Sequence, residues 1–239
     1  QDYPEQIRDP AWVRKPGVIR MKTLFALLLS IVVTAVGAQS PQNEPGSDPD
    51  SVRAWSAFSA NNYSAALTSY RKAAARNHAL AQFNLGVMLI QGLGAESSPK
   101  EGVAWLRKAA DNNLPRAQYV LASLHERGEH VTKSMTEATM WYRKAAERGF
   151  RDAQVSLATQ YFLGRGVSQD YKQAANWYEL AAAQGDAGSC YVIASLYEQG
   201  TGVPQDLERA QGWYAQAAAR GDPVAEIKAR ELERRLRSI

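Results

Sequence analysis

The sequence contains very little cysteine or histidine: one cysteine, Cys190, and three histidines in 239 residues. A single cysteine cannot form an intramolecular disulfide, so no disulfide framework holds this chain together. No apolar run reaches the roughly 20 residues that a membrane-spanning helix needs; residues 24–36 form only a short one, interrupted by Ser30 and Thr34. The net charge is +4 with both signs mixed along the chain, which is a weak pattern for nucleic-acid binding.

Signals for catalysis and metal binding are also missing. His125 and His130 lie on either side of Gly128, and no third ligand is evident beside them, so we expect no metal site. No combination of serine, histidine and acid stands out as a catalytic set. Three G-x-G pairs follow helical segments rather than strands, so turn geometry explains them better than nucleotide binding. We therefore expect no enzymatic activity and no cofactor.

A 36-residue repeat is the main feature of the sequence. The segment 153–185 returns 36 residues later and is also recognisable one and two steps earlier. Within it, Ala153, Leu157 and Tyr161 lie at helical spacing, and a glycine pair follows them. A second apolar stripe, with Trp177 and Tyr178 at its centre, comes next. Self-similarity at a period of this size is typical of a helical solenoid.

The pattern A-x3-L-[GA]-x2-[YLH]-x2-G-x-G-V-x2-D-x3-A-x2-W-Y-x2-A-A-x2-G resembles the Sel1-like repeat, a relative of the tetratricopeptide repeat. The second unit departs from it at His130 and Ser134, and the first at Ser98. The resemblance implies an all-α fold, a right-handed αα superhelical solenoid of helix pairs. It also implies a scaffold for protein–protein interaction. The binding partner is then expected to be another protein or a peptide.

The repeat divides the chain into units. We expect an upstream extension at 1–20, a signal peptide at 21–38 and a flexible linker at 39–50. A tetratricopeptide-like opening helix pair at 51–80 comes next. Four Sel1-like repeats are expected at 81–116, 117–152, 153–188 and 189–222, and a polar capping helix at 223–239.

The segment that begins at Met21 has the pattern of a secretory signal. Lys22 supplies a positive charge, residues 24–36 an apolar core, and Val36-Gly37-Ala38 a small-residue cleavage site. A cleaved signal peptide is the favoured interpretation, and an uncleaved anchor is the alternative. The mature chain is then expected to be exported to a bacterial periplasm or secreted, with no membrane span.

The first helix of each unit is expected to line the concave surface of the solenoid. Positions two, six and nine after the repeat alanine should face away from the packing stripe. Exposed aromatic groups in these positions would suit contacts with a protein or peptide. The positions are Phe83, Val87 and Ile90; Tyr119, Ser123 and Glu126; Val155, Thr159 and Phe162; and Tyr191, Ser195 and Glu198.

Two other functions remain open at this point. Some secreted Sel1-like proteins carry a cysteine pair in each repeat and have been linked to penicillin-binding or β-lactamase activity, so a cell-wall enzyme or accessory is one alternative. The missing cysteine pairs weaken it. A self-assembling structural spacer is the other. Cys190 itself is expected to be a small core residue.

Overall fold

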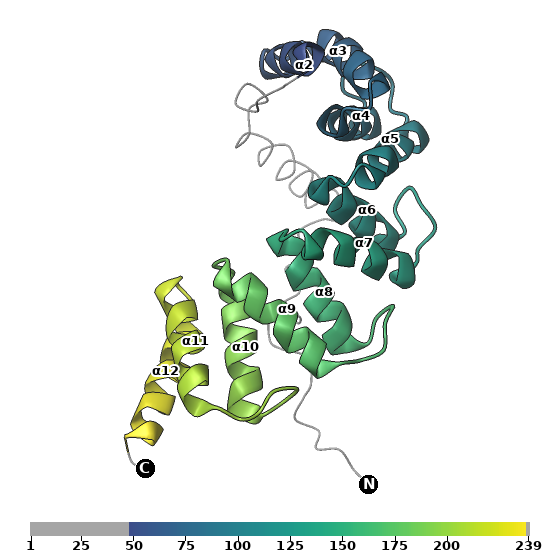
Figure 1. The fold of residues 1–239 in the computed structure, drawn as a ribbon. Coiled ribbons are helices and arrows are strands. Elements are labelled where there is room, and N and C mark those ends of the chain that lie inside the picture. Colours follow the sequence, from purple (N-terminus) through teal and green to yellow (C-terminus); the bar gives the residue numbers. More distant parts are fainter. Residues whose placement is uncertain (1–47, 238–239) are drawn as a thin grey trace. The chain divides into compact units, whose positions relative to one another are not determined.

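The computed structural model describes residues 48–237, which form eleven α-helices and no strand. Helices α4 to α11 make four pairs, each with a first and a second helix. Successive helices along the chain pack against one another, which confirms the all-α solenoid (Figure 1). The first helices are α4 (Ala79–Gln91), α6 (Pro115–Arg127), α8 (Arg151–Leu163) and α10 (Ala187–Gln199); the second helices are α5 (Pro99–Asp111), α7 (Met135–Glu147), α9 (Tyr171–Ala183) and α11 (Leu207–Ala219). The opening pair is α2 (Pro49–Ser59) and α3 (Tyr63–Ala75), and α12 (Pro223–Leu236) follows the last repeat.

Two predicted boundaries change. Each first helix begins two residues before the repeat alanine that was used to mark the unit. The linker expected at 39–50 ends earlier, because Pro49 already belongs to α2. The Asp48 carboxylate accepts hydrogen bonds from the backbone N–H groups of Asp50 and Ser51, at 3.0 and 3.1 Å, and so caps this helix. The upstream extension, the signal peptide and most of the linker lie outside the described residues.

Glycine and short polar side chains set the helix ends. Every first helix of the four repeats ends at a glycine in the left-handed conformation, with φ between 66° and 71°. Asp170 and Asp206 directly precede the second helices α9 and α11 as N-caps, and their carboxylates each accept a backbone N–H at 2.9 Å. Ser134 replaces the aspartate before α7 and still accepts the N–H of Glu137, at 3.2 Å. The departure at this position therefore keeps the cap.

The second glycine in the loops of the first, third and fourth repeats explains the G-x-G pattern. A Cβ on Gly202 would lie 2.4 Å from the carbonyl carbon of Tyr171, the first residue of the preceding second helix. Gly166 has the same relation to Met135, at 2.4 Å, and its φ is 69°. Only glycine combines this backbone conformation with so close an approach. These glycines are structural, as the sequence predicted.

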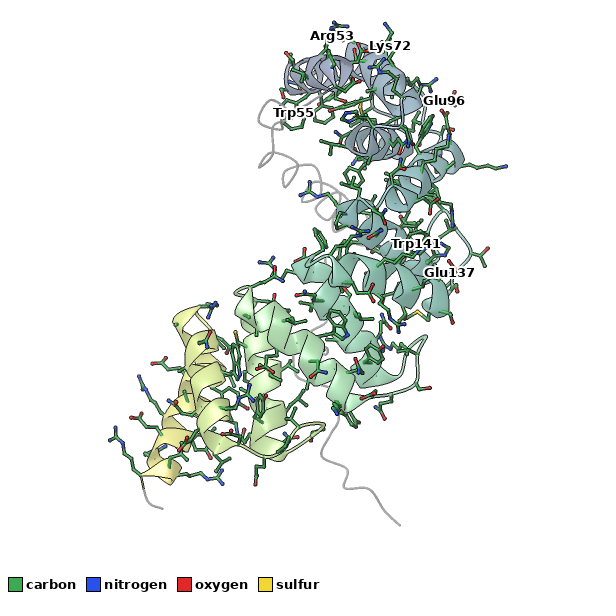
Figure 2. The ribbon with its side chains drawn as sticks, in the orientation of Figure 1. Arg53, Trp55, Lys72, Glu96, Glu137 and Trp141 are labelled. Carbon is green, nitrogen blue, oxygen red and sulfur yellow. The ribbon has the colours of Figure 1, made fainter. Side chains whose placement is uncertain are left out.

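The core is built from the predicted stripes. Leu85, Leu121, Leu157 and Ile193 are fully buried on the first helices. On the second helices the small residues Ala109, Ala145, Ala181 and Ala217 are also fully buried. Trp141, labelled in Figure 2, belongs to α7 and is 3% exposed. The ammonium of Lys144 lies 4.0 Å from its ring centroid. Small residues allow close helix packing, and the aromatic residues fill the space between neighbouring helices.

Helix α12 is built as a cap. It continues the register of the first helices, and Ala225, Ala229 and Leu232 are buried against the rest of the stack. Three exposed positions of α12 are charged where α10 has buried residues. They are Glu226, Arg230 and Glu233, which stand 36 residues after Cys190, Ala194 and Tyr197. Charged groups on this side favour contact with water, as a terminal repeat requires.

A candidate binding face on the first helices

The twelve positions predicted for binding belong to one side of α4, α6, α8 and α10, which we call the first-helix face. The structure corrects the prediction for the first repeat. Phe83 is fully buried and Val87 is 8% exposed, because residues 81–89 of α4, most of them apolar, are buried throughout. Ile90 is half-buried. Phe83 is therefore a core residue rather than a binding residue.

The second repeat forms a compact aromatic and acidic cluster. Tyr119 on α6 packs against Tyr142 on α7, with ring centroids 5.6 Å apart. Glu126, two turns further along α6, accepts a 2.7 Å hydrogen bond from the Tyr142 hydroxyl on one carboxylate oxygen. Its other oxygen accepts the side-chain amide of Gln160 on α8, at 3.0 Å. Tyr119, Glu126 and Tyr142, which we call the middle cluster, therefore join three successive helices.

The fourth repeat contains an equivalent cluster, which we call the last cluster: Tyr191, Glu198 and Tyr214. The rings of Tyr191 on α10 and Tyr214 on α11 lie 5.2 Å apart. The Tyr214 hydroxyl donates to one oxygen of Glu198, at 2.9 Å. The ammonium of Lys228 on α12 donates to the other, at 3.3 Å. The two clusters have equivalent tyrosines and an equivalent carboxylate but differ in the second donor to that carboxylate, Gln160 in one and Lys228 in the other.

The third repeat lies between these clusters and is different. Val155, Thr159 and Phe162 are its half-buried residues on the first-helix face. The Thr159 hydroxyl lies 2.9 Å from the hydroxyl of Tyr178 on α9, and Phe162 packs edge-on against Tyr171 at 5.3 Å. Neutral and apolar groups therefore separate the two acidic clusters.

Burial sets the ionisation of the tyrosines. It raises the pKa of Tyr142 and of Tyr214 far above the usual value for a phenol, and the adjacent carboxylates Glu126 and Glu198 raise it further. Burial also raises the pKa of Tyr119 and Tyr191. All four phenols are thus neutral at ordinary pH, and those of Tyr142 and Tyr214 donate to Glu126 and Glu198.

The predicted face was incomplete. Tyr142 and Tyr214 complete the clusters, although they belong to second helices and were interpreted only as packing residues. A tyrosine stands at this position in three successive repeats, which suggested a packing role alone. Tyr178, in the third repeat, pairs with the Thr159 hydroxyl instead of a carboxylate. Ile227 on α12 was also missed: it stands 36 residues after Tyr191 and is 67% exposed. The repeat register could have identified it if it had been continued into the cap.

The remaining candidates have structural surroundings. His125 is buried, with its ring nitrogens 3.4 Å from the Arg107 guanidinium and 3.3 Å from the Thr132 carbonyl oxygen. Within residues 48–237 no group of three potential ligands is arranged to hold a metal ion. Cys190 is fully buried, and its thiol lies 3.7 Å from the carbonyl oxygen of Ala182, eight residues earlier. Gln118 and Gln154 occupy the same repeat position, and each donates a hydrogen bond to the carbonyl oxygen eight residues before it. Cys190 is therefore a core residue, and burial raises the pKa of its thiol.

The described part of the chain, 48–237, includes no helix with enough length and apolar character to cross a membrane.

The Sel1 repeat family matches four consecutive segments, 79–114, 115–150, 151–186 and 187–222. Each segment begins at the first residue of a first helix, in the order α4, α6, α8 and α10. The chain belongs to the Sel1 repeat family, whose members typically serve as protein-interaction scaffolds. No curated protein sequence matches the chain.

Two solved structures show the same fold. A protective antigen of uropathogenic Escherichia coli with an SLR fold is 28% identical, with a TM-score of 0.70 over 85% of this chain and 43% of the antigen. A Sel1 repeat protein from Oxalobacter formigenes is 34% identical, with a TM-score of 0.66 over 71% of this chain and 50% of that protein. The chain thus spans about half the length of these relatives or less.

Proposed function

We propose that this chain is an exported scaffold that binds another protein or a peptide through the first-helix face. The observation that carries the proposal is the pair of clusters centred on Tyr119 and Tyr191. Both tyrosines are half-buried, and a second-helix tyrosine packs against each of them. Aromatic side chains fixed in this way can contact a partner at a small cost in conformational entropy.

Export is supported by the signal-like segment 21–38 and by the similarity to a protective antigen, a kind of protein that the immune system encounters. The test is a fusion of residues 21–47 to alkaline phosphatase, which is active only after export. We expect activity from the fusion and its loss when Leu28 is changed to arginine, because a charge in the apolar core prevents insertion. Equal activity from both fusions would contradict export through this segment.

Binding is tested by crosslinking capture from envelope fractions, with Tyr119→Ala/Tyr191→Ala beside the parent chain. A matched control, Met140→Ala/Leu180→Ala, removes two exposed apolar side chains from second helices, 38% and 49% exposed. Circular dichroism first establishes that all three proteins are folded. We expect one protein to be recovered with the parent and the control and lost with the tyrosine variant.

The other outcomes distinguish the alternatives. Loss with the control alone would place binding on the second helices. If no partner is recovered, hydrolysis of a chromogenic β-lactam would favour the cell-wall enzyme. Concentration-dependent light scattering of the purified chain would favour the spacer.

A further inference from the structure

The middle and last clusters differ at one repeat position. Lys228, which binds Glu198, stands on α12 two repeat lengths after Ser156 on α8. In the repeat register, Ser156 therefore has the position in the middle cluster that Lys228 has in the last cluster, and its side chain hydrogen-bonds with Tyr119. The chain thus contains the same cluster twice, once with an ammonium of its own and once without.

The last cluster shows what this arrangement binds. The Lys228 ammonium lies 3.3 Å from Glu198, whose side chain is only 15% exposed. Its charge also acts on Tyr191, since it opposes the rise in the pKa of that phenol caused by burial. A carboxylate flanked by aromatic rings is a favourable place for an alkyl ammonium, because the rings cover the methylene groups and the carboxylate neutralises the charge.

The middle cluster has the same carboxylate without an ammonium beside it, although the charge of Arg127 acts on Tyr119 as that of Lys228 acts on Tyr191. Within residues 48–237 Glu126 takes part in no ion pair, and both of its hydrogen-bond donors, Tyr142 and Gln160, are neutral groups. The nearest basic neighbour along the helix, Arg127, pairs with Glu129 at 3.4 Å. A half-buried carboxylate in this situation gains from a charged donor more than from a neutral one.

We propose that the middle cluster, Tyr119, Glu126 and Tyr142, binds the side-chain ammonium of a lysine presented by the partner protein. This inference rests on the proposed function and names the group that the first-helix face recognises. The incoming lysine takes the place beside Glu126 that Lys228 takes beside Glu198. The last cluster does not compete for it, because its own lysine already fills the site.

Lysine fits this site better than arginine. The two oxygens of Glu126 already accept hydrogen bonds from Tyr142 and Gln160, and these donors come from different helices. A guanidinium makes its strongest contact with both oxygens at once, whereas an ammonium is compact and needs only one. The contact made by Lys228 to a single oxygen of Glu198 is of this second kind.

The test uses an array of random 11-residue peptides that carry lysine, arginine or norleucine at the central position. Norleucine keeps the alkyl chain and lacks the charge. The full chain is compared with Glu126→Gln, which removes the charge, and with Ser156→Lys, which supplies the cluster with its own ammonium. We expect the parent to prefer lysine peptides, and both variants to bind them at least tenfold more weakly.

The reciprocal change is Lys228→Ser, which empties the last cluster. Calorimetric titration with the best lysine peptide should then show up to a second equivalent bound, while Ser156→Lys/Lys228→Ser should retain only the site at Glu198. Thermal unfolding followed by circular dichroism checks that every variant is folded. Ser156 and Lys228 are both half-buried, so the exchange is compatible with the fold.

Two results overturn the inference in different ways. If peptides bind with equal affinity whether they carry lysine or norleucine, and Tyr119→Ala/Tyr191→Ala still abolishes binding, the proposed function holds and the lysine site is wrong. If no peptide binds and no partner is captured, the proposed function fails and the lysine site fails with it.

Discussion

The interior of the solenoid and its first-helix face follow different periods. In the interior the same residue types return every 36 positions, as with the buried alanines 109, 145, 181 and 217. On the face, the tyrosine and glutamate of the second repeat return only after 72 positions, with apolar Val155 and Phe162 between them. Each interior position meets a neighbour of the same kind in every repeat, so packing holds it constant. A face position has fewer neighbours and is free to differ.

The largest effect is expected in the interior. Gly202→Ala should lower the free energy of unfolding by about 3 kcal/mol, since φ is 74° and the new Cβ would lie 2.4 Å from the Tyr171 carbonyl carbon. Gly212→Ala is the matched control: it lies within α11 and a Cβ there meets no atom within 4 Å, so it should be neutral or slightly stabilising. Urea denaturation measures both. Equal losses would show that the loop contact is not what requires glycine.

Removal of single tyrosine hydroxyls tests the difference between the second repeat, which has a carboxylate acceptor, and the third repeat, which has a neutral one. Tyr142→Phe removes a hydrogen bond to a carboxylate and should cost about 2 kcal/mol of unfolding free energy. Tyr178→Phe removes a bond to the neutral hydroxyl of Thr159 and should cost about 1 kcal/mol. The ring remains in both variants, so packing is unchanged. A larger loss from the Tyr178 variant would contradict the importance of the carboxylate.

High pH should reduce the contribution of Tyr142 and Tyr214 to the free energy of unfolding. Burial raises the pKa of Tyr142 and Tyr214 in the folded state, so their contribution is complete below the unfolded value near 10 and declines as pH rises above it. At one pH unit above 10 the loss is about 1.4 kcal/mol per tyrosine. The change in urea midpoint between pH 9 and 11 should be smaller in Tyr142→Phe/Tyr214→Phe than in the parent. If the urea midpoint changes by the same amount in the parent and in the double variant, ionisation of these two phenols does not cause the loss of stability at high pH.

The smallest effect concerns the loop of the second repeat. His130 has φ of 59° where the other repeats have glycine. His130→Gly should stabilise the fold by about 1 kcal/mol, because a side chain is unfavourable in this conformation. Asn113→Gly, at φ 64°, should gain less, since asparagine tolerates this region. Thermal unfolding of the two variants provides the measurement, and a destabilised glycine variant would indicate that the His130 side chain makes a useful contact.

Much of this architecture follows from the sequence because its signals are local and repeated. The glycines that end α8 and α10, the aspartate caps Asp170 and Asp206, and the buried stripes were all predicted, and the structure confirms them. The helix starts were displaced by two residues, since a cap such as Asp186 is outside the apolar pattern that marks the repeat. The prediction for Phe83 was wrong because helical spacing gives the direction of a side chain and not what covers it.

By itself the sequence determined the repeat length, the helix pairs, their ends and the family, because turn conformation and helical periodicity depend on residues close together in the chain. Only the tertiary structure decided how the first-helix face is assembled. Tyr142 meets Glu126 across 16 residues, Gln160 meets it across 34, and Lys228 meets Glu198 across 30. The first contact joins the two helices of one repeat, and the other two arise from the stacking of one unit on the next, so no single unit contains all the information that specifies the face.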